Sequence, residues 1–188
     1  MRGRAPSTAP STGPGWVRKP RRSRRFVIGA AIASVLAIAG STLGRHALRL
    51  VHNASDSVPT GWYRIEPADR VAVGDIVLVQ LPAEVTALAA RRGYLPSGVP
   101  LLKSVIARSG QKVCVVGSRI RVDGTTVAQA LEQDRAGRAM PRWTGCRALG
   151  AEELMLIAPG NAESFDSRYF GPVTLDAVIG KARRVQLN

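Results

Sequence analysis

An uncharged apolar run near the N-terminus constrains this chain more than any other feature of its sequence. The 19 residues from Phe26 to Gly44 contain no charged side chain. As an α-helix they would extend about 28 Å at about 1.5 Å per residue, close to the thickness of a bilayer's hydrocarbon core. A basic cluster, Arg18–Arg25, directly precedes the run. Because cytoplasmic flanks are enriched in Lys and Arg, the sequence predicts a single-pass anchor with the N-terminus inside and the main part of the chain outside.

The same segment also fits a cleaved signal peptide. A basic stretch, an apolar stretch and the small residues at Ala37–Ala39 suit a processing site. We favour an uncleaved anchor, because the run continues past that site to membrane-spanning length. The first 15 residues are rich in Pro, Ser, Thr and Gly, which is typical of disorder. We therefore expect a disordered basic cytoplasmic tail at 1–25, a transmembrane anchor at 26–44 and an exported domain at 45–188.

The net charge of +14 is concentrated at the same end of the chain. Residues 1–50 contain ten Lys or Arg and no acidic residue, whereas residues 51–188 contain 17 basic and 13 acidic residues. An Arg-rich tail would also suit a DNA-handling protein. A topology signal explains it better here, because the tail is fused to the apolar run. We therefore expect membrane lipid as a partner, and no nucleic acid.

The exported domain is predicted to be mainly β, with one or two short helices. Short β-rich segments alternate with Gly, Pro and Asp, and Asp123-Gly124 is a strong hairpin turn signal. One helix is predicted at 82–92, where Pro82 stands at the start and Gly93 follows the end. Strands are predicted at 75–81, 101–107, 112–116, 119–122, 125–127, 153–158 and 177–185.

The motifs of several enzyme classes are missing from this sequence. It has no glycine-rich phosphate loop, no CxxC and no HExxH, so we expect no cofactor and no metal site. The only histidines, His46 and His52, lie just beyond the apolar run, where a polar interface residue is the simpler interpretation. If the protein is an enzyme, its catalytic base is therefore expected not to be histidine.

Lysine is rare in this chain, and one lysine stands in an apolar setting. Only four of the 27 basic residues are Lys, and Lys103 lies within the predicted strand at 101–107. Burial disfavours the charged form and so lowers a lysine's pKa, whereas an arginine keeps its proton. Lys103 could therefore serve as a neutral base. The alternative is a structural lysine whose amine reaches water while its stem packs in the strand.

A candidate nucleophile precedes a proline in a polar loop. Ser57 is followed by Val58 and Pro59, and Pro59 biases Val58 toward extended backbone. Gly61 permits a tight turn afterwards. Such a loop can hold one hydroxyl on rigid backbone, although an ordinary surface loop has the same composition.

Two cysteines, Cys114 and Cys146, both fall in the exported domain. Because exported proteins meet an oxidising compartment, we expect a disulfide between them. Two free buried thiols are the alternative.

Four segments in order resemble the signal peptidase I family of Ser-Lys peptidases, and among its members the TraF-like branch of conjugative transfer. The resemblance covers about residues 51–185. The chain lacks the Met that general signal peptidases carry after the serine, and it lacks their large extra β-domain, which points to the smaller branch. The four segments are Ser57–Gly61 with Tyr63, Gly74–Val77, Leu101–Ala107 running into Gly110, and Ser164–Pro172 followed by Gly180–Ala182.

The resemblance implies an antiparallel β domain and a role for each matching residue. Ser57 would attack the scissile carbonyl, and Lys103 would take its proton. The hydroxyl of Ser55 and the backbone N–H of Ser57 would form the oxyanion hole. Asp166 and Arg168 would form a supporting ion pair, and Ser164 would orient the lysine amine.

The function implied is that of a serine endopeptidase in the inner membrane, with its catalytic domain in the periplasm. Its substrate would be an exported precursor, typically the conjugative pilin in this branch, and a conjugative transfer complex is a further expected partner. Two alternatives stay open. One is a general signal peptidase that acts on many signal-peptide-bearing proteins, and the other is a non-catalytic anchored scaffold of a conjugation or secretion complex.

Overall fold

A computed structural model describes residues 24–43 and 50–186 of the chain. It divides into an N-terminal unit up to Arg45 and a domain from His46 onward. The N-terminal unit contains the helix α1 (Arg24–Leu43), which covers most of the apolar run. Within this described part of the chain, no helix is long and apolar enough to cross a membrane. The anchor at 26–44 therefore stays a prediction, and residues 1–23 of the predicted tail lie outside the described residues.

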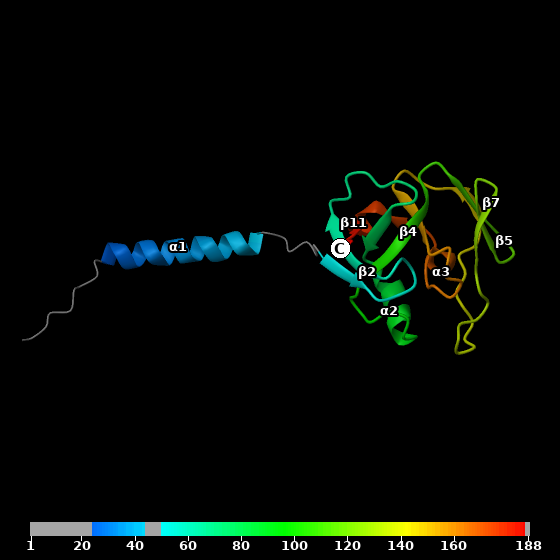
Figure 1. The fold of residues 1–188 in the computed structure, drawn as a ribbon, viewed down its shortest axis with the longest axis horizontal. Helices are drawn as coiled ribbons and strands as arrows, with labels where there is room; N and C mark the ends of the chain where they lie inside the picture. Colours follow the sequence, from blue (N-terminus) through cyan, green and yellow to red (C-terminus); the bar gives the residue numbers. More distant parts are fainter. Residues whose placement is uncertain (1–23, 44–49, 187–188) are drawn as a thin grey trace, which may run out of the picture. The chain divides into compact units, whose positions relative to one another are not determined.

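The domain is built from two antiparallel sheets, as Figure 1 shows. The larger sheet contains, in spatial order, β1 (Leu50–Asn53), β2 (Gly61–Glu66), β11 (Val178–Arg184), β3 (Ile76–Val79), β4 (Leu101–Arg108), β9 (Glu153–Ile157) and β10 (Val173–Thr174). The smaller sheet contains β7 (Thr125–Gln129), β6 (Arg119–Val122), β5 (Lys112–Val116) and β8 (Cys146–Ala148). The short helices are α2 (Ala83–Arg91), α3 (Ser167–Phe170) and a 3₁₀ turn at Leu175–Ala177.

The mainly β fold class is confirmed, and all seven predicted strands and the helix at 82–92 are present to within two residues at each end. The Asp123-Gly124 turn has positive φ at both residues, 47° and 87°, as a type I′ hairpin requires. Four strands were not predicted from the sequence: β1, β2, β8 and β10. Two of these have only two or three residues, which is too short for a periodic pattern to form.

The core of the larger sheet places a lysine among buried aliphatic side chains. Lys103 lies in β4, near the middle of the sheet, directly opposite Val77 of β3. A second cluster joins Val58, next to the candidate nucleophile, to Tyr63 and Leu102. This packing fixes the loop between β1 and β2 against the strand that carries the lysine.

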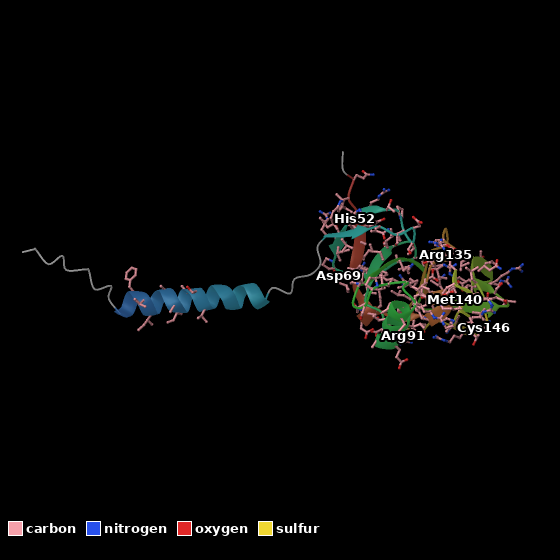
Figure 2. All side chains as sticks on the ribbon, turned by 90° about the horizontal axis from the view of Figure 1, so that it is seen from below. His52, Asp69, Arg91, Arg135, Met140 and Cys146 are labelled. Carbon is pink, nitrogen blue, oxygen red and sulfur yellow. A yellow bond between two sulfur atoms is a disulfide. The ribbon has the colours of Figure 1, made fainter. Side chains whose placement is uncertain are left out.

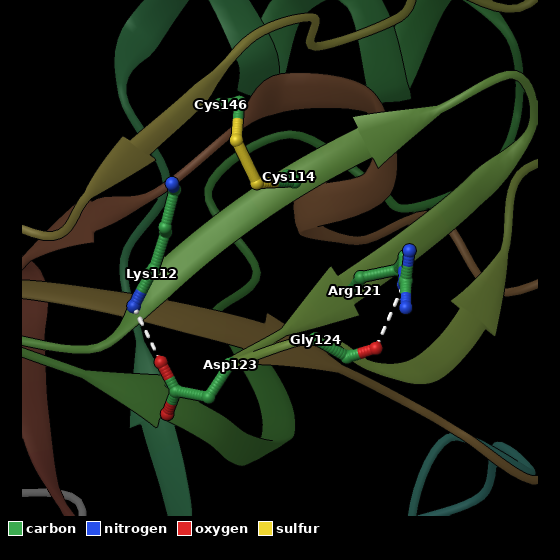
Figure 3. Close-up of a disulfide and its surroundings, with 6 residues drawn as sticks. All are labelled: Lys112, Cys114, Arg121, Asp123, Gly124 and Cys146. Carbon is green, nitrogen blue, oxygen red and sulfur yellow. Dashed lines mark hydrogen bonds between the residues drawn. A yellow bond between two sulfur atoms is a disulfide. The ribbon is translucent and has the colours of Figure 1, made fainter.

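A disulfide crosses the smaller sheet, as predicted. Cys114 of β5 and Cys146 of β8 are directly opposite residues of neighbouring strands and are bonded (Figure 3). Beside it, the N–H of Lys112 donates to Asp123 and closes the β5–β6 hairpin, 2.8 Å between N and Oδ1.

Removing this disulfide is expected to lower the free energy of unfolding by about 3–4 kcal/mol. The reason is the chain entropy that the unfolded state regains when a loop of this length is opened. Urea denaturation of the full chain, wild type against the double variant Cys114→Ala/Cys146→Ala, measures the difference. Equal midpoints and equal slopes for the two proteins would contradict this prediction.

Candidate active site

Three side chains from distant segments converge at one point of the domain. Lys103 Nζ lies 2.5 Å from Ser57 Oγ and donates to it. Nζ also donates to the hydroxyl of Ser164, and the two serine hydroxyls are 3.4 Å apart. Ser57 comes from the β1–β2 loop, Lys103 from β4, and Ser164 from the loop before α3. The fold therefore brings together a hydroxyl and an amine that the sequence separates by 46 residues.

The amine of Lys103 is shielded from solvent. The residue is only 3% exposed, and the next side chains on its face of β4, Leu101 and Val105, are buried aliphatic groups. Burial is the largest cause that lowers the pKa of Lys103 from 10.5 to about 8, and Arg168 lowers it further, while Asp166 raises it. A lysine with this pKa exists partly in the neutral form near pH 7, and the neutral form can accept a proton.

The rate of any reaction that uses Lys103 as a base is expected to depend on this pKa. Below about pH 8 the neutral fraction falls about tenfold for each pH unit, so kcat/KM is expected to rise with that slope and level off above pH 8. Peptide cleavage assayed between pH 5.5 and 9.5 measures this, with circular dichroism at each pH as a control for folding. A rate that is flat or falls across this range would exclude a lysine base.

The β1–β2 loop, which carries Ser57, is held by apolar packing and by hydrogen bonds. Val58 packs into the core beside Ser57, and the Tyr63 hydroxyl donates to the carbonyl of Pro59 at 2.7 Å. Ser55, the predicted oxyanion-hole residue, lies in the same loop, and its hydroxyl donates to Asn53 Oδ1 at 2.9 Å. The role of Ser55 toward a substrate stays a prediction.

A buried ion pair supports the loop that carries Ser164. Arg168 Nη2 lies 2.8 Å from Asp166 Oδ2, and both side chains are essentially inaccessible to solvent. Asp166 caps the N-terminus of α3 and accepts the N–H of Ala158 at the end of β9. The Arg168 guanidinium also donates to four backbone carbonyls, those of Gln129, Asn161, Ala162 and Ser164. The predicted pair thus connects β7, β9 and the Ser164 loop.

A cavity of about 780 Å³ opens beside Ser57 and Lys103. This volume lies in the range of small-molecule and peptide pockets. One wall is formed by residues of the segment 131–140, among them Arg135 and Met140, both labelled in Figure 2. Asp134 fixes this wall by accepting the Tyr94 hydroxyl at 2.5 Å, and Arg135 pairs with Glu163. Among the residues that the structure describes, no three His, Cys, Asp or Glu side chains are grouped so that they could hold a metal ion.

Comparison with models of protein families identifies the family of this chain. The family model described as "Signal peptidase, peptidase S26" matches residues 22–186. The chain belongs to this family. A catalytic serine beside a buried lysine is what the resemblance led us to expect of this S26 peptidase, and the four matching segments of the sequence all lie within the matched range.

Relatives of this S26 peptidase include proteins named for conjugation. A "Probable conjugal transfer protein TraF" of Sinorhizobium fredii is 37% identical, covering 88% of this chain and 91% of that protein. A "Conjugal transfer protein TraF" of Agrobacterium fabrum is 35% identical (87% and 97%), and a "Plasmid transfer protein TraF" of Escherichia coli is 32% identical (80% and 89%). Among solved structures, a signal peptidase I of Enterococcus faecalis matches with a TM-score of 0.36 and 16% identity, covering 60% of this chain and 97% of that one.

Two parts of the site were not predicted from the sequence. One is Asn53, whose buried side chain bonds to the loop that carries Ser57. The pattern Asn53-Ala54-Ser55 is typical of an Asx turn and could have drawn attention to it. The other is the wall at 131–140, which depends on a contact between Tyr94 and Asp134, 40 residues apart, and which no local pattern indicates.

Proposed function

We propose that this S26 peptidase is a serine endopeptidase that uses Ser57 and Lys103 to cleave an exported precursor during conjugation. The observation that carries the proposal is the contact of 2.5 Å between Ser57 Oγ and the Nζ of a lysine that is 3% exposed. A hydroxyl is a weak nucleophile on its own and needs a base within hydrogen-bond distance. Lys103 is that base.

The chemistry follows from the positions of the two groups. Neutral Lys103 takes the proton of Ser57 as Oγ attacks the scissile carbonyl. The backbone N–H of Ser57 stabilises the resulting oxyanion. The hydroxyl of Ser55 adds to this when it turns its single hydrogen from Asn53 Oδ1 to the oxyanion. The charged amine then gives its proton to the leaving amine, and an acyl-enzyme on Ser57 remains. Neutral again, Lys103 activates the water that hydrolyses this ester. Ser164, bonded to the same amine, keeps Nζ directed toward Ser57.

The proposed place of action is the periplasmic face of the inner membrane. The apolar run at 26–44 and the basic cluster before it support a membrane anchor. Thirteen residues separate Gly44 from Ser57, a length of at most about 45 Å of extended chain. A precursor cleaved close to its own apolar segment would present its scissile bond within that reach. The disulfide fits an oxidising compartment.

The proposed substrate is the pilin precursor of a conjugative system. Relatives named for conjugal and plasmid transfer support it. Comparing processed protein termini by mass spectrometry in a strain that lacks this gene and in its parent tests the assignment. We expect one precursor, or a few encoded beside this gene, to stay unprocessed. Loss of processing for many secreted proteins would instead identify a general signal peptidase.

A further inference from the structure

A buried amide at the end of β1 bonds to the loop that carries the nucleophile. Asn53 is 6% exposed. Its Nδ2 donates to the carbonyls of Ser55 and Val58, both at 2.8 Å, and more weakly to that of Pro59 at 3.3 Å. Its Oδ1 accepts the backbone N–H of Ser55 at 3.2 Å and the hydroxyl of Ser55 at 2.9 Å. One side chain thus contacts backbone groups on both sides of Ser57.

These bonds reach peptide groups that the loop's other supports do not, since Arg184 donates to the carbonyl of Thr60, farther from Ser57. The core holds Val58 through apolar packing, which resists displacement of the side chain but does not orient the peptide groups. The Tyr63 hydroxyl reaches only the carbonyl of Pro59. The peptide groups of Ser55 and Val58, which flank Ser57, are bonded to Asn53. The bond to the Val58 carbonyl is buried, and a buried carbonyl without a donor is costly, so this loop conformation depends on an amide at position 53.

The residue type is also constrained by chemistry. A primary amide supplies two donor hydrogens and an acceptor oxygen within one short side chain. Aspartate has nearly the same shape, but it has no hydrogen to give to the three carbonyls and would place a negative charge against them. Alanine would remove the donors and the acceptor together. Among residues of this size, only asparagine can bond both to Ser55, before the nucleophile, and to the carbonyl of Val58, after it.

We propose that Asn53 is a positioning residue of the active site, an inference that rests on the proposed function. By holding the peptide groups on either side of Ser57, Asn53 keeps Oγ within hydrogen-bond distance of Lys103 Nζ. Through its bonds to the N–H and hydroxyl of Ser55, it also holds Ser55 beside the site, from where the hydroxyl can turn toward the reacting carbonyl. Because Asn53 acts through the loop, its loss should slow the chemical step more than it weakens substrate binding.

The test compares three variants of the full chain in detergent, using an internally quenched Ala-rich peptide as the probe. For Asn53→Ala and Asn53→Asp we expect kcat to fall by about 100-fold with KM changed by less than about threefold, since a nucleophile displaced by about 1 Å costs that much. Val113→Ala is the control, because Val113 is fully buried in the core of the smaller sheet, in a different cluster from Val58 of the loop. It should lower the thermal midpoint but leave kcat unchanged.

Hydrogen exchange of the peptide 54–60, measured by mass spectrometry, gives a readout that does not depend on activity. Exchange should become faster in both Asn53 variants and stay unchanged in Val113→Ala. A kcat within about threefold of wild type in either Asn53 variant overturns the inference while the proposed function stands. An equal loss of kcat in Val113→Ala also overturns it, because destabilisation alone would then explain the effect. Absence of cleavage by the wild type, or full activity of Ser57→Ala, refutes the proposed function itself, and this inference with it.

Discussion

Lys103→Met is expected to lower kcat/KM for peptide cleavage by at least about 10⁴-fold while the domain still folds. In one well-studied serine peptidase, removing the base costs about 10⁶-fold in kcat, and removing the group that orients the base costs about 10⁴-fold. Methionine has nearly the same length and suits a buried site, but it cannot accept a proton. The same loss is expected for Lys103→Arg, because a guanidinium keeps its proton. The measurement is steady-state cleavage of the Ala-rich quenched peptide at pH 8.

The matched control is Lys112→Met, which replaces an exposed lysine at the start of β5. This variant should cleave as fast as the wild type. If Lys103→Met kept more than about 1% of the wild-type activity, Lys103 could not be the general base.

The methionine variant should also be no less stable than the wild type at pH 7. The pKa of Lys103 is lowered from 10.5 to about 8, so between these values the unfolded state binds more protons than the folded state. Stability therefore rises as the pH increases through this window, and below about pH 8 the charged lysine costs about 3 kcal/mol. Methionine removes that cost, and it also removes the hydrogen bonds from Lys103 to Ser57 and Ser164. Urea denaturation of both proteins at pH 7 measures the difference. A methionine variant much less stable than the wild type would contradict the claim that burying the charged lysine destabilises the fold.

Asp166→Ala is expected to have the largest effect on stability, a loss of about 3–5 kcal/mol in the free energy of unfolding. The substitution leaves the guanidinium of Arg168 buried without its counter-charge, and such a charge is costly in the interior. It also removes the acceptor for the N–H of Ala158 and the cap of α3. Urea denaturation of the full chain measures the change.

The control for this variant is an ion pair at the surface. Glu66 bonds to Arg64 at 3.0 Å and lies 3.6 Å from Arg183. The two arginines are exposed and Glu66 is partly exposed, so Glu66→Ala should cost less than about 1 kcal/mol. Equal effects of the two substitutions would mean that burial of the Asp166–Arg168 pair has no energetic consequence.

Much of the fold could be predicted because the strands bury one face or both. β4 and β9 are short apolar segments bounded by turn residues, and α2 has a proline before it and a glycine after it. β1 and β2 were missed because their outward faces carry exposed apolar residues, Leu50 and Trp62, which hide the alternation of a half-buried strand. Position within the larger sheet, and not local pattern, makes these segments strands.

Some residues of the candidate site could likewise be identified from the sequence, and others could not. Lys103 could be identified because a lone lysine in an apolar strand is unusual on its own. Ser57 and the Ser164–Arg168 segment needed the resemblance to a family, since each is an ordinary polar sequence by itself. Asn53 could not be assigned a role, because its partners are mostly backbone groups, which any loop sequence possesses. The contact of Tyr94 with Asp134 forms only when the chain has folded.

The roles of Ser57 and Lys103 can be tested by maturation of the pilin precursor in a strain that lacks this gene and carries it back on a plasmid. Wild type, Ser57→Ala and Lys103→Arg are compared at equal protein levels, and the mass of the pilin product is measured. We expect mature pilin with the wild-type gene and only precursor with either variant. Mature pilin in both variants would show that Ser57 and Lys103 do not catalyse the cleavage and would leave the domain as a scaffold.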